Sequence, residues 1–266
     1  MRLSARRIGA VFLRHFYLLT RSWPRLLDLV YWPTMQMILW GFISKYLTVQ
    51  HGPAAGIAAT FLTAVLLWDT LFRGQLGTSL CFLEEMYARH LGHLFMSPLR
   101  PYELVIAVFG VATVRVLIGV GGAALLAVPI HHFWIGAALG WSLLPYFAVL
   151  LMFGWAVGLI ISGLVLRLGM GAESLAWAAI FLIQPLSGVY YPISTLPPPV
   201  QWISWILPAA SVFEGMRGVV LHDTFDLGLF AHAVIALVAW LALAGIAFVL
   251  LFRQARDRGQ LLQVGE

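Results

Sequence analysis

Charged side chains within otherwise apolar stretches are the groups in this sequence best suited to ligand binding. Asp69 and Arg73 lie four residues apart, so on a helix they share one face and can form an ion pair. Arg115 lies well inside another apolar stretch, with no acidic residue within helical reach. An isolated charge in hydrocarbon is costly, so such a side chain should face protein or water. We interpret these three residues as candidates for a polar path through an apolar domain, or for pairs that hold helices together.

A second pair of charges occurs near the end of the apolar region. Glu214 and Arg217 are three residues apart, and they can pair with each other or line an exit from the same path. For Arg115 the candidate partners are a headgroup phosphate, an anionic substrate, a backbone carbonyl or another helix. The sequence alone does not choose among them.

Two groups of residues could form a catalytic dyad or a metal site, but neither has the full pattern that such a site requires. Ser187 and His232 could form a nucleophile–base dyad, but the rhomboid protease pattern places glycine two residues before the serine, where Pro185 stands here. The histidines of the polar segments, His90 with His93 and the adjacent His131 and His132, bring no convergent cysteine or carboxylate set. We therefore predict no catalytic residue, no metal site and no bound cofactor in this chain.

The composition is that of an integral membrane protein. Of the 266 residues, 61% are hydrophobic and only 10% are charged. The mean hydropathy is +0.91, whereas a soluble domain carries about 25% charged residues. The single cysteine, Cys81, permits no disulfide within the chain.

The pattern predicts an all-α membrane protein built as one transmembrane domain over residues 1–266. A span needs about 20 apolar residues as helix. Spans are expected at 29–47, 54–81, 174–190 and 227–252, with two more sharing the uncharged stretch 116–166 and divided near Pro129. The six spans make up a membrane domain over 27–252, followed by a basic cytoplasmic tail over 253–266.

Two segments are expected to lie at the membrane surface. In residues 1–26, apolar side chains such as Val11 and Phe12 alternate at helical period with Arg7 and Arg14, which is typical of an amphipathic interfacial helix. Residues 200–207 are apolar but too short to cross, which indicates a re-entrant outer segment between spans five and six that ends at Pro208.

Orientation follows from the uneven distribution of lysine and arginine. With both termini cytoplasmic, the outer side receives only Lys45 and Arg217. The cytoplasmic side receives the remaining loop and terminal arginines: Arg2, Arg6, Arg7, Arg14, Arg21, Arg25, Arg89, Arg100, Arg167, Arg253, Arg256 and Arg258. Topology and anionic membrane lipids therefore account for the net charge of +5, and no nucleic-acid partner is expected.

Three local patterns resemble the membrane subunit of ABC-2 type exporters. The segment before the third span reads FMSPLRPYEL at 95–104 and is similar to the family's SPLRPWEL. The end of the fifth span reads QPLSGVYYP at 184–192, followed by LP at 196–197, and resembles P-x-S-G-x-x-[FY]-P…LP. Pro208 with Glu214 and Arg217 resembles the family's P…E-x-x-R. Their order and spacing extend the resemblance over nearly the whole chain.

The resemblance implies a transport subunit of the bacterial inner membrane that is not itself an enzyme. It implies a dimer of this chain with two copies of an ATP-binding cassette subunit, which would bind ATP and Mg²⁺ and drive export of an amphipathic or lipid-linked substrate. This chain has no phosphate loop, and its only lysine is Lys45. In such subunits the inner loop docks on the ATPase, so the coupling candidates are Glu84, Glu85, Arg89 and Arg100.

An ion-coupled secondary transporter, using Asp69 and Arg115, is the alternative. We find no obvious inverted repeat and no matching pair of broken helices to support it.

Overall fold

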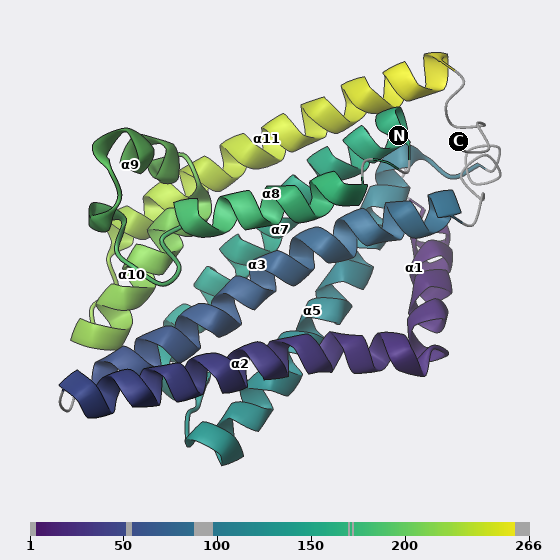
Figure 1. Ribbon diagram of the computed structural model, residues 1–266. Helices are drawn as coiled ribbons and strands as arrows, with labels where there is room; N and C mark the ends of the chain where they lie inside the picture. The colour runs from purple at the N-terminus through teal and green to yellow at the C-terminus, as the bar shows by residue number, and fades with distance from the viewer. Residues whose placement is uncertain (1–3, 52–54, 88–97, 170, 172, 259–266) are drawn as a thin grey trace.

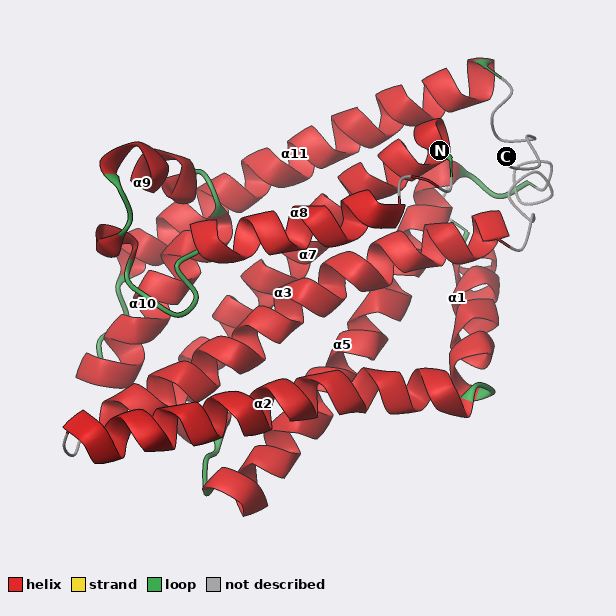
Figure 2. Cartoon of the chain, in the orientation of Figure 1, coloured by secondary structure: helices red, strands yellow, loops and turns green. Residues whose placement is uncertain are grey.

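The computed structural model describes residues 4–51, 55–87, 98–169, 171 and 173–258. Within these residues every regular element is helical (Figure 2). The helices that run along the bundle are α2 (Trp23–His51), α3 (Ala55–Tyr87), α5 (Pro101–His131), α7 (Leu143–Leu168), α8 (Glu173–Leu186) and α11 (Leu227–Asp257). The elements that lie at its ends or corners are α1 (Ala5–Thr20), α6 (Ile135–Leu139), η1 (Gly140–Ser142), η3 (Ile193–Thr195), α9 (Pro198–Trp205) and α10 (Pro208–His222).

Four helical segments are long and apolar enough to cross a membrane: Trp23–Tyr46, Pro101–His131, Ile135–Leu168 and Leu227–Asp257. The predicted all-helical membrane class is confirmed to that extent. The other two predicted spans correspond to α3, which is not among these four segments, and α8, which has 14 residues. The count of six spans stays a prediction, as do the orientation and the re-entrant segment.

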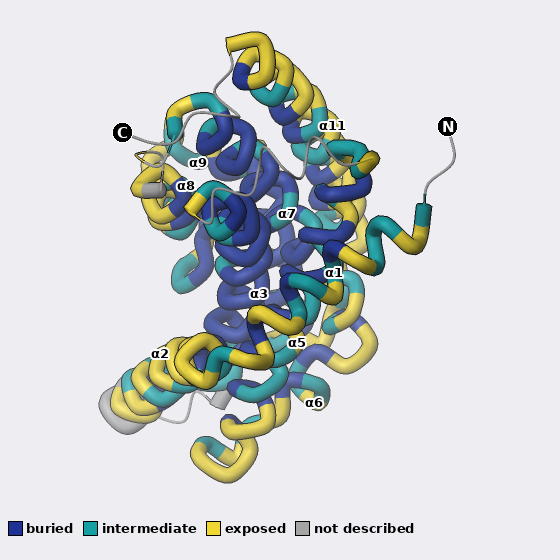
Figure 3. The backbone as a smooth tube through the Cα atoms, turned by 90° about the vertical axis from the view of Figure 1, so that its right-hand side faces the viewer, coloured by how far each residue is buried: buried dark blue, intermediate teal, exposed yellow. Residues whose placement is uncertain are grey.

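The core lies where α3 packs between α7 and α5. In Figure 3 these central helices are largely buried, whereas α2 and the outer side of α11 are exposed. Two glycines of α7 allow the closest approach, because a Cβ on Gly154 would lie 2.7 Å from the Leu71 carbonyl oxygen and one on Gly158 would lie 2.6 Å from Thr78 Cβ. Such contact joins α3 and α7 into one rigid unit.

The two ends of the bundle differ in construction (Figure 1). We call one the α1 end, formed by α1, the last turns of α3 and the first turns of α5. The N-terminus and the end of α11 lie there too. We call the other the α9 end, formed by the turn at 187–192, η3, α9 and α10.

Several helix boundaries depart from the sequence-based expectation. The amphipathic helix ends at Thr20 rather than at 26, and the chain turns through Arg21 into α2, which begins at Trp23. Helix α3 continues beyond 81, so Glu84 and Glu85 belong to its last turns rather than to a loop. The predicted short helix does end before Pro208, as α9 at Trp205, and Pro208 itself starts α10, because proline suits the first helical position.

Candidate functional site

Glu103, in the first turn of α5, anchors the N-terminal helix. Its side chain is fully buried, and its two carboxylate oxygens accept hydrogen bonds from Arg7 Nη2 at 2.6 Å and Arg7 Nε at 2.8 Å. The backbone N–H groups of Ser4 and Arg100 donate to the same carboxylate, each at 3.1 Å. The hydrogen bond with Glu103 raises the pKa of the Arg7 guanidinium. One buried carboxylate therefore ties the start of α1 to the start of α5.

Glu85 makes the second link, between α1 and α3. It accepts a hydrogen bond from Arg14 Nη2 at 2.9 Å, and its other oxygen lies 3.3 Å from His15 Nε2. The His15 ring is buried, with Nδ1 lying 3.1 Å from the Val11 carbonyl oxygen. Glu85 is itself 3% exposed, so its carboxylate faces α1 and not the surrounding medium.

Glu84 links three helices. Its carboxylate oxygens lie 3.3 and 3.4 Å from Arg115 Nη2 on α5, and one lies 3.5 Å from Arg25 Nη1 on α2. The buried Arg115 side chain passes beside Gly77 of α3 to reach it. We expected no partner for Arg115 within its own helix, and the structure supplies one from another helix.

Deeper between the same helices lies the predicted pair of Asp69 and Arg73. Arg73 Nε donates to Asp69 Oδ2 at 2.6 Å, and both side chains are buried, which confirms the pairing. A Cβ added to Gly119 of α5 would lie 2.9 Å from Arg73 Nε and 2.8 Å from the Leu29 carbonyl of α2. Glycine at this position lets α2 and α5 close around the ion pair.

Glu214 and Arg217 lie at the α9 end, far from the other predicted residues. They pair at 3.1 Å, as expected from their spacing. Arg217 Nη1 also donates to the Gly188 carbonyl at 2.9 Å, and Glu214 accepts from the Ile193 backbone N–H at 2.6 Å. Gly188 has φ +60, a conformation that favours glycine. The pair thus fixes the turn that follows α8.

At the α9 end an aromatic stack joins α2, α3 and the turn after α8. Trp40 stacks on Tyr190 with ring centroids 4.2 Å apart and on Phe61 at 5.7 Å. Gln184 Nε2 donates to the Tyr190 hydroxyl at 3.3 Å. The sequence gives no sign of this stack, because nothing in the spacing of Tyr190 relates it to Trp40.

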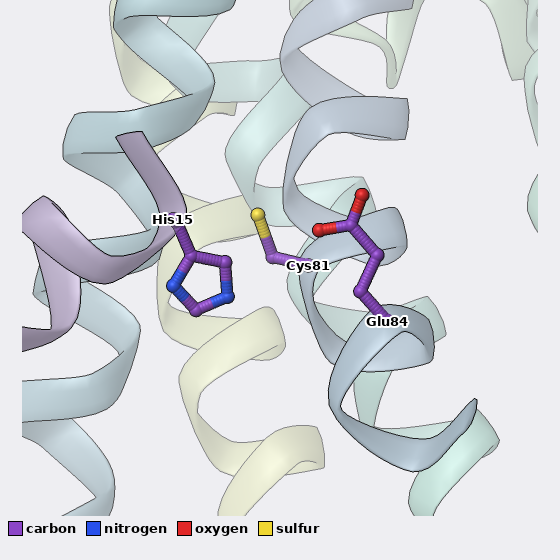
Figure 4. A group of neighbouring side chains, drawn as sticks. All are labelled: His15, Cys81 and Glu84. Carbon is purple, nitrogen blue, oxygen red and sulfur yellow. The ribbon is translucent and has the colours of Figure 1, made fainter. Parts of the chain in front are cut away.

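The structure also assembles a group that the sequence did not indicate (Figure 4). The ligand-type atoms of His15, Cys81 and Glu84 all lie within 4.8 Å of one another. These residue types can bind a metal ion. However, Glu84 already lies against two guanidinium groups, those of Arg115 and Arg25, whose positive charge opposes a further cation.

The remaining candidates are placed as follows. Arg100 lies at the start of α5, where its Nη1 donates to the Tyr102 hydroxyl at 2.6 Å. Arg89 lies outside the described residues, as do His90 and His93. Ser187 donates to the Ile183 carbonyl and does not face His232, whose Nδ1 lies 2.8 Å from the Ser211 hydroxyl instead.

The order of the helices, the ion pairs that join α1 to α3 and α5, and the turn after α8 can now be compared with known protein families. The family model described as ABC-2 type transporter matches residues 7–221. The chain belongs to the ABC-2 type transporter family. The match runs from α1 to the last turn of α10, so it contains most of the interactions described above, including every ion pair between helices. No curated protein matches the chain.

Membership makes this chain an ABC-2 transporter membrane subunit, a multi-pass permease component. Permeases of this family normally work with an ATP-binding cassette partner, and are generally not catalytic themselves. The recognition made from the three sequence patterns is confirmed. The individual roles assigned to site residues stay predictions.

Proposed function

We propose that this chain is the membrane-spanning half of an ATP-driven exporter of the bacterial inner membrane. In the proposed assembly two copies pair with each other and with two copies of a separate ATP-binding subunit. The proposed cargo is an amphipathic or lipid-linked molecule, such as a glycolipid, a polysaccharide precursor or a drug, moved outward from the cytoplasm or the inner leaflet. The family match over residues 7–221 is the observation that carries the proposal.

The α1 end is the proposed cytoplasmic face. It holds α1 with its arginines, Arg100, and the basic end of α11 at Arg253 and Arg256, which accords with the bias of positive residues toward the cytoplasm. The α9 end, with Trp202 exposed near its surface, is the proposed outer face.

Force from the ATPase would enter through the connection between α3 and α5. Glu84 and Glu85 lie just before this connection and Glu103 just after it. Their carboxylates hold Arg7, Arg14 and other cations of α1, α2 and α5, so displacement of the connection would pull on α1 and α2 together. In this mechanism the glutamates act as positioning residues.

Direct contact with the ATPase would fall to residues at the surface of the connection. Arg100 is partly exposed, and Arg89 lies within the part of the connection outside the described residues. Glu85 is buried against α1 and therefore suits transmission rather than docking. ATP and Mg²⁺ would be held by the partner, because this chain contains no phosphate loop.

The proposed translocation path follows the charged residues between α2, α3 and α5. Arg115 and the pair of Asp69 and Arg73 would offer polar contacts to a cargo headgroup, while apolar helix faces accommodate its hydrocarbon part. At the α9 end, Glu214 and Arg217 would border the exit. An amphipathic cargo suits this combination of buried charge and apolar wall.

The decisive experiment is co-purification of the tagged protein in mild detergent, followed by mass spectrometry. We expect an ATPase that carries a phosphate loop, in equal numbers to this chain, and ATP-dependent transport when both are placed in vesicles. A partner variant with its phosphate-loop lysine replaced is the matched control and should be inactive. Transport driven by an ion gradient without any ATPase would overturn the proposal.

A further inference from the structure

The bend between α1 and α2 holds a pocket, open to the surface, with a basic lining. Its volume is about 560 Å³. Its walls are formed by Arg14, Tyr17, Leu18, Arg21, Ser22 and Arg25. Three guanidinium groups and two hydroxyl groups therefore converge on it, and no carboxylate lines it. We call it the elbow pocket.

Charge counting shows that the carboxylates nearby do not neutralise these arginines. Glu85 pairs with Arg14, while Glu84 is divided between Arg25 and Arg115. Arg21 is exposed and has no carboxylate partner among the described residues. Four arginine charges thus face two glutamate charges, an excess of two, and counting the exposed Asp28 one turn beyond Arg25 still leaves an excess of one.

This excess of positive charge decides whether a cation or an anion is the better ligand for this region. The adjacent group of His15, Cys81 and Glu84 has metal-ligand chemistry, yet a cation there would add to an existing positive excess. An anion in the elbow pocket would reduce the excess and receive several guanidinium donors. Such planar, forked donors match the geometry of phosphate, as they do that of carboxylate.

The apolar surroundings indicate that the phosphate belongs to a lipid. Beside the arginines, α1 and the start of α2 expose Leu13, Tyr17, Leu18 and Trp23, the last with 70% of its surface accessible. Tryptophan favours the headgroup level, and an amphipathic helix buries its apolar face among acyl chains. The pocket therefore combines headgroup donors with a wall for hydrocarbon.

We propose that the elbow pocket binds the phosphate of an anionic phospholipid of the cytoplasmic leaflet and thereby holds the angle between α1 and α2. The proposal rests on the orientation adopted under the proposed function. The lipid phosphate bridges Arg21 of the bend to Arg14 or Arg25, whose guanidinium groups keep donors beyond those used by the glutamates.

The test uses the full-length protein in nanodiscs of phosphatidylcholine containing increasing fractions of phosphatidylglycerol. Retained lipid is counted by native mass spectrometry, and the distance across the α1–α2 bend is followed by a spin-label pair. We expect one phosphatidylglycerol retained per chain, and Arg21→Gln should weaken its retention about tenfold, because one hydrogen bond between charged groups is lost. Arg21 makes no ion pair within the described residues, so this variant should fold as the parent does.

Arg6→Gln is the matched control, because Arg6 is an exposed arginine of α1 that does not line the pocket. An equal loss in both variants, or no retained lipid, would overturn the proposal in favour of general surface attraction. Displacement of the lipid by millimolar inorganic phosphate would overturn the lipid assignment and indicate a free-phosphate site. The proposed function is tested separately, by co-purification of the ATPase with the parent protein, so failure here is distinguishable from failure of the proposed function.

Discussion

The two ends of the bundle both use buried glutamate–arginine pairs, but they use them differently. At the α1 end the paired residues are far apart in sequence, by 96 residues for Arg7 with Glu103 and 31 for Arg115 with Glu84. They join separate helices mainly through side chains, although Glu103 also accepts hydrogen bonds from the backbone N–H groups of Ser4 and Arg100. At the α9 end Glu214 and Arg217 are three residues apart on one helix, and their other bonds go to backbone groups.

This difference suits the ends to different tasks. Side-chain pairs between helices can exchange partners, and Glu84 already lies against two arginines at once. Helices joined in this way can move without leaving a charge unpaired. A guanidinium bonded to a backbone carbonyl holds one turn in one shape, because no other group can replace the bond. The α1 end is therefore expected to transmit motion and the α9 end to serve as a fixed frame.

The largest effect should follow removal of Arg217. In Arg217→Ala the buried Gly188 carbonyl loses its donor and Glu214 loses its cation, and we expect a cost of about 3–5 kcal/mol in the free energy of unfolding. Denaturant titration of the purified protein measures it. Arg256→Ala is the control, because that side chain is 62% exposed and should change stability by less than about 0.5 kcal/mol. Equal effects would show that the α9 end is not a fixed frame.

Glu103→Gln should produce a smaller and more local effect. The amide cannot accept the charged fork of Arg7 as the carboxylate does, so α1 should separate from α5 at a cost of about 1.5–3 kcal/mol. Hydrogen exchange should rise throughout α1 while α9 and α10 stay protected. Exchange that rises equally at both ends would mean that the α1 end does not open independently.

A third comparison addresses the sharing of Glu84 between helices. Glu84→Gln and Arg115→Gln, alone and combined, form a double-mutant cycle with an expected coupling energy of about 0.5–3 kcal/mol. If partners exchange, Arg25→Gln should couple to Glu84→Gln as well, and more strongly once Arg115 is replaced. Strict additivity in all three combinations would show that Glu84 does not link the helices.

Local patterns in the sequence anticipated some of this arrangement. The pairs of Asp69 with Arg73 and Glu214 with Arg217 follow from helical spacing, which involves only neighbouring turns. The bend before α2 could also have been found, because Ser22 and Pro24 have the residue types that begin helices. The prediction instead extended the interfacial helix to residue 26.

The linkages at the α1 end could not be read from the sequence. The contact of Arg115 with Glu84 depends on the register of α3 against α5, and that of His15 with Glu85 depends on where α1 lies across the bundle. Both are set by packing between helices, including the close approach allowed by Gly77 and Gly119. The predicted span 54–81 did find α3, but the central place of this helix between α7 and α5 is set by packing as well.

The smallest expected effect tests the comparison between the two ends through its dependence on salt concentration. The Arg14 side chain is 37% exposed, so Arg14→Gln should cost about 0.2–1 kcal/mol at low ionic strength, while His15 remains beside the Glu85 carboxylate. Because the Debye length falls to about 3 Å in 1 M salt, that cost should nearly vanish there. The cost of Arg217→Ala should persist, since its guanidinium is only 10% exposed and its bonds to backbone do not depend on long-range attraction. The stability cost of each variant is measured at both salt concentrations. If both costs fell by the same fraction, the distinction between an exchangeable α1 end and a fixed α9 end would be removed.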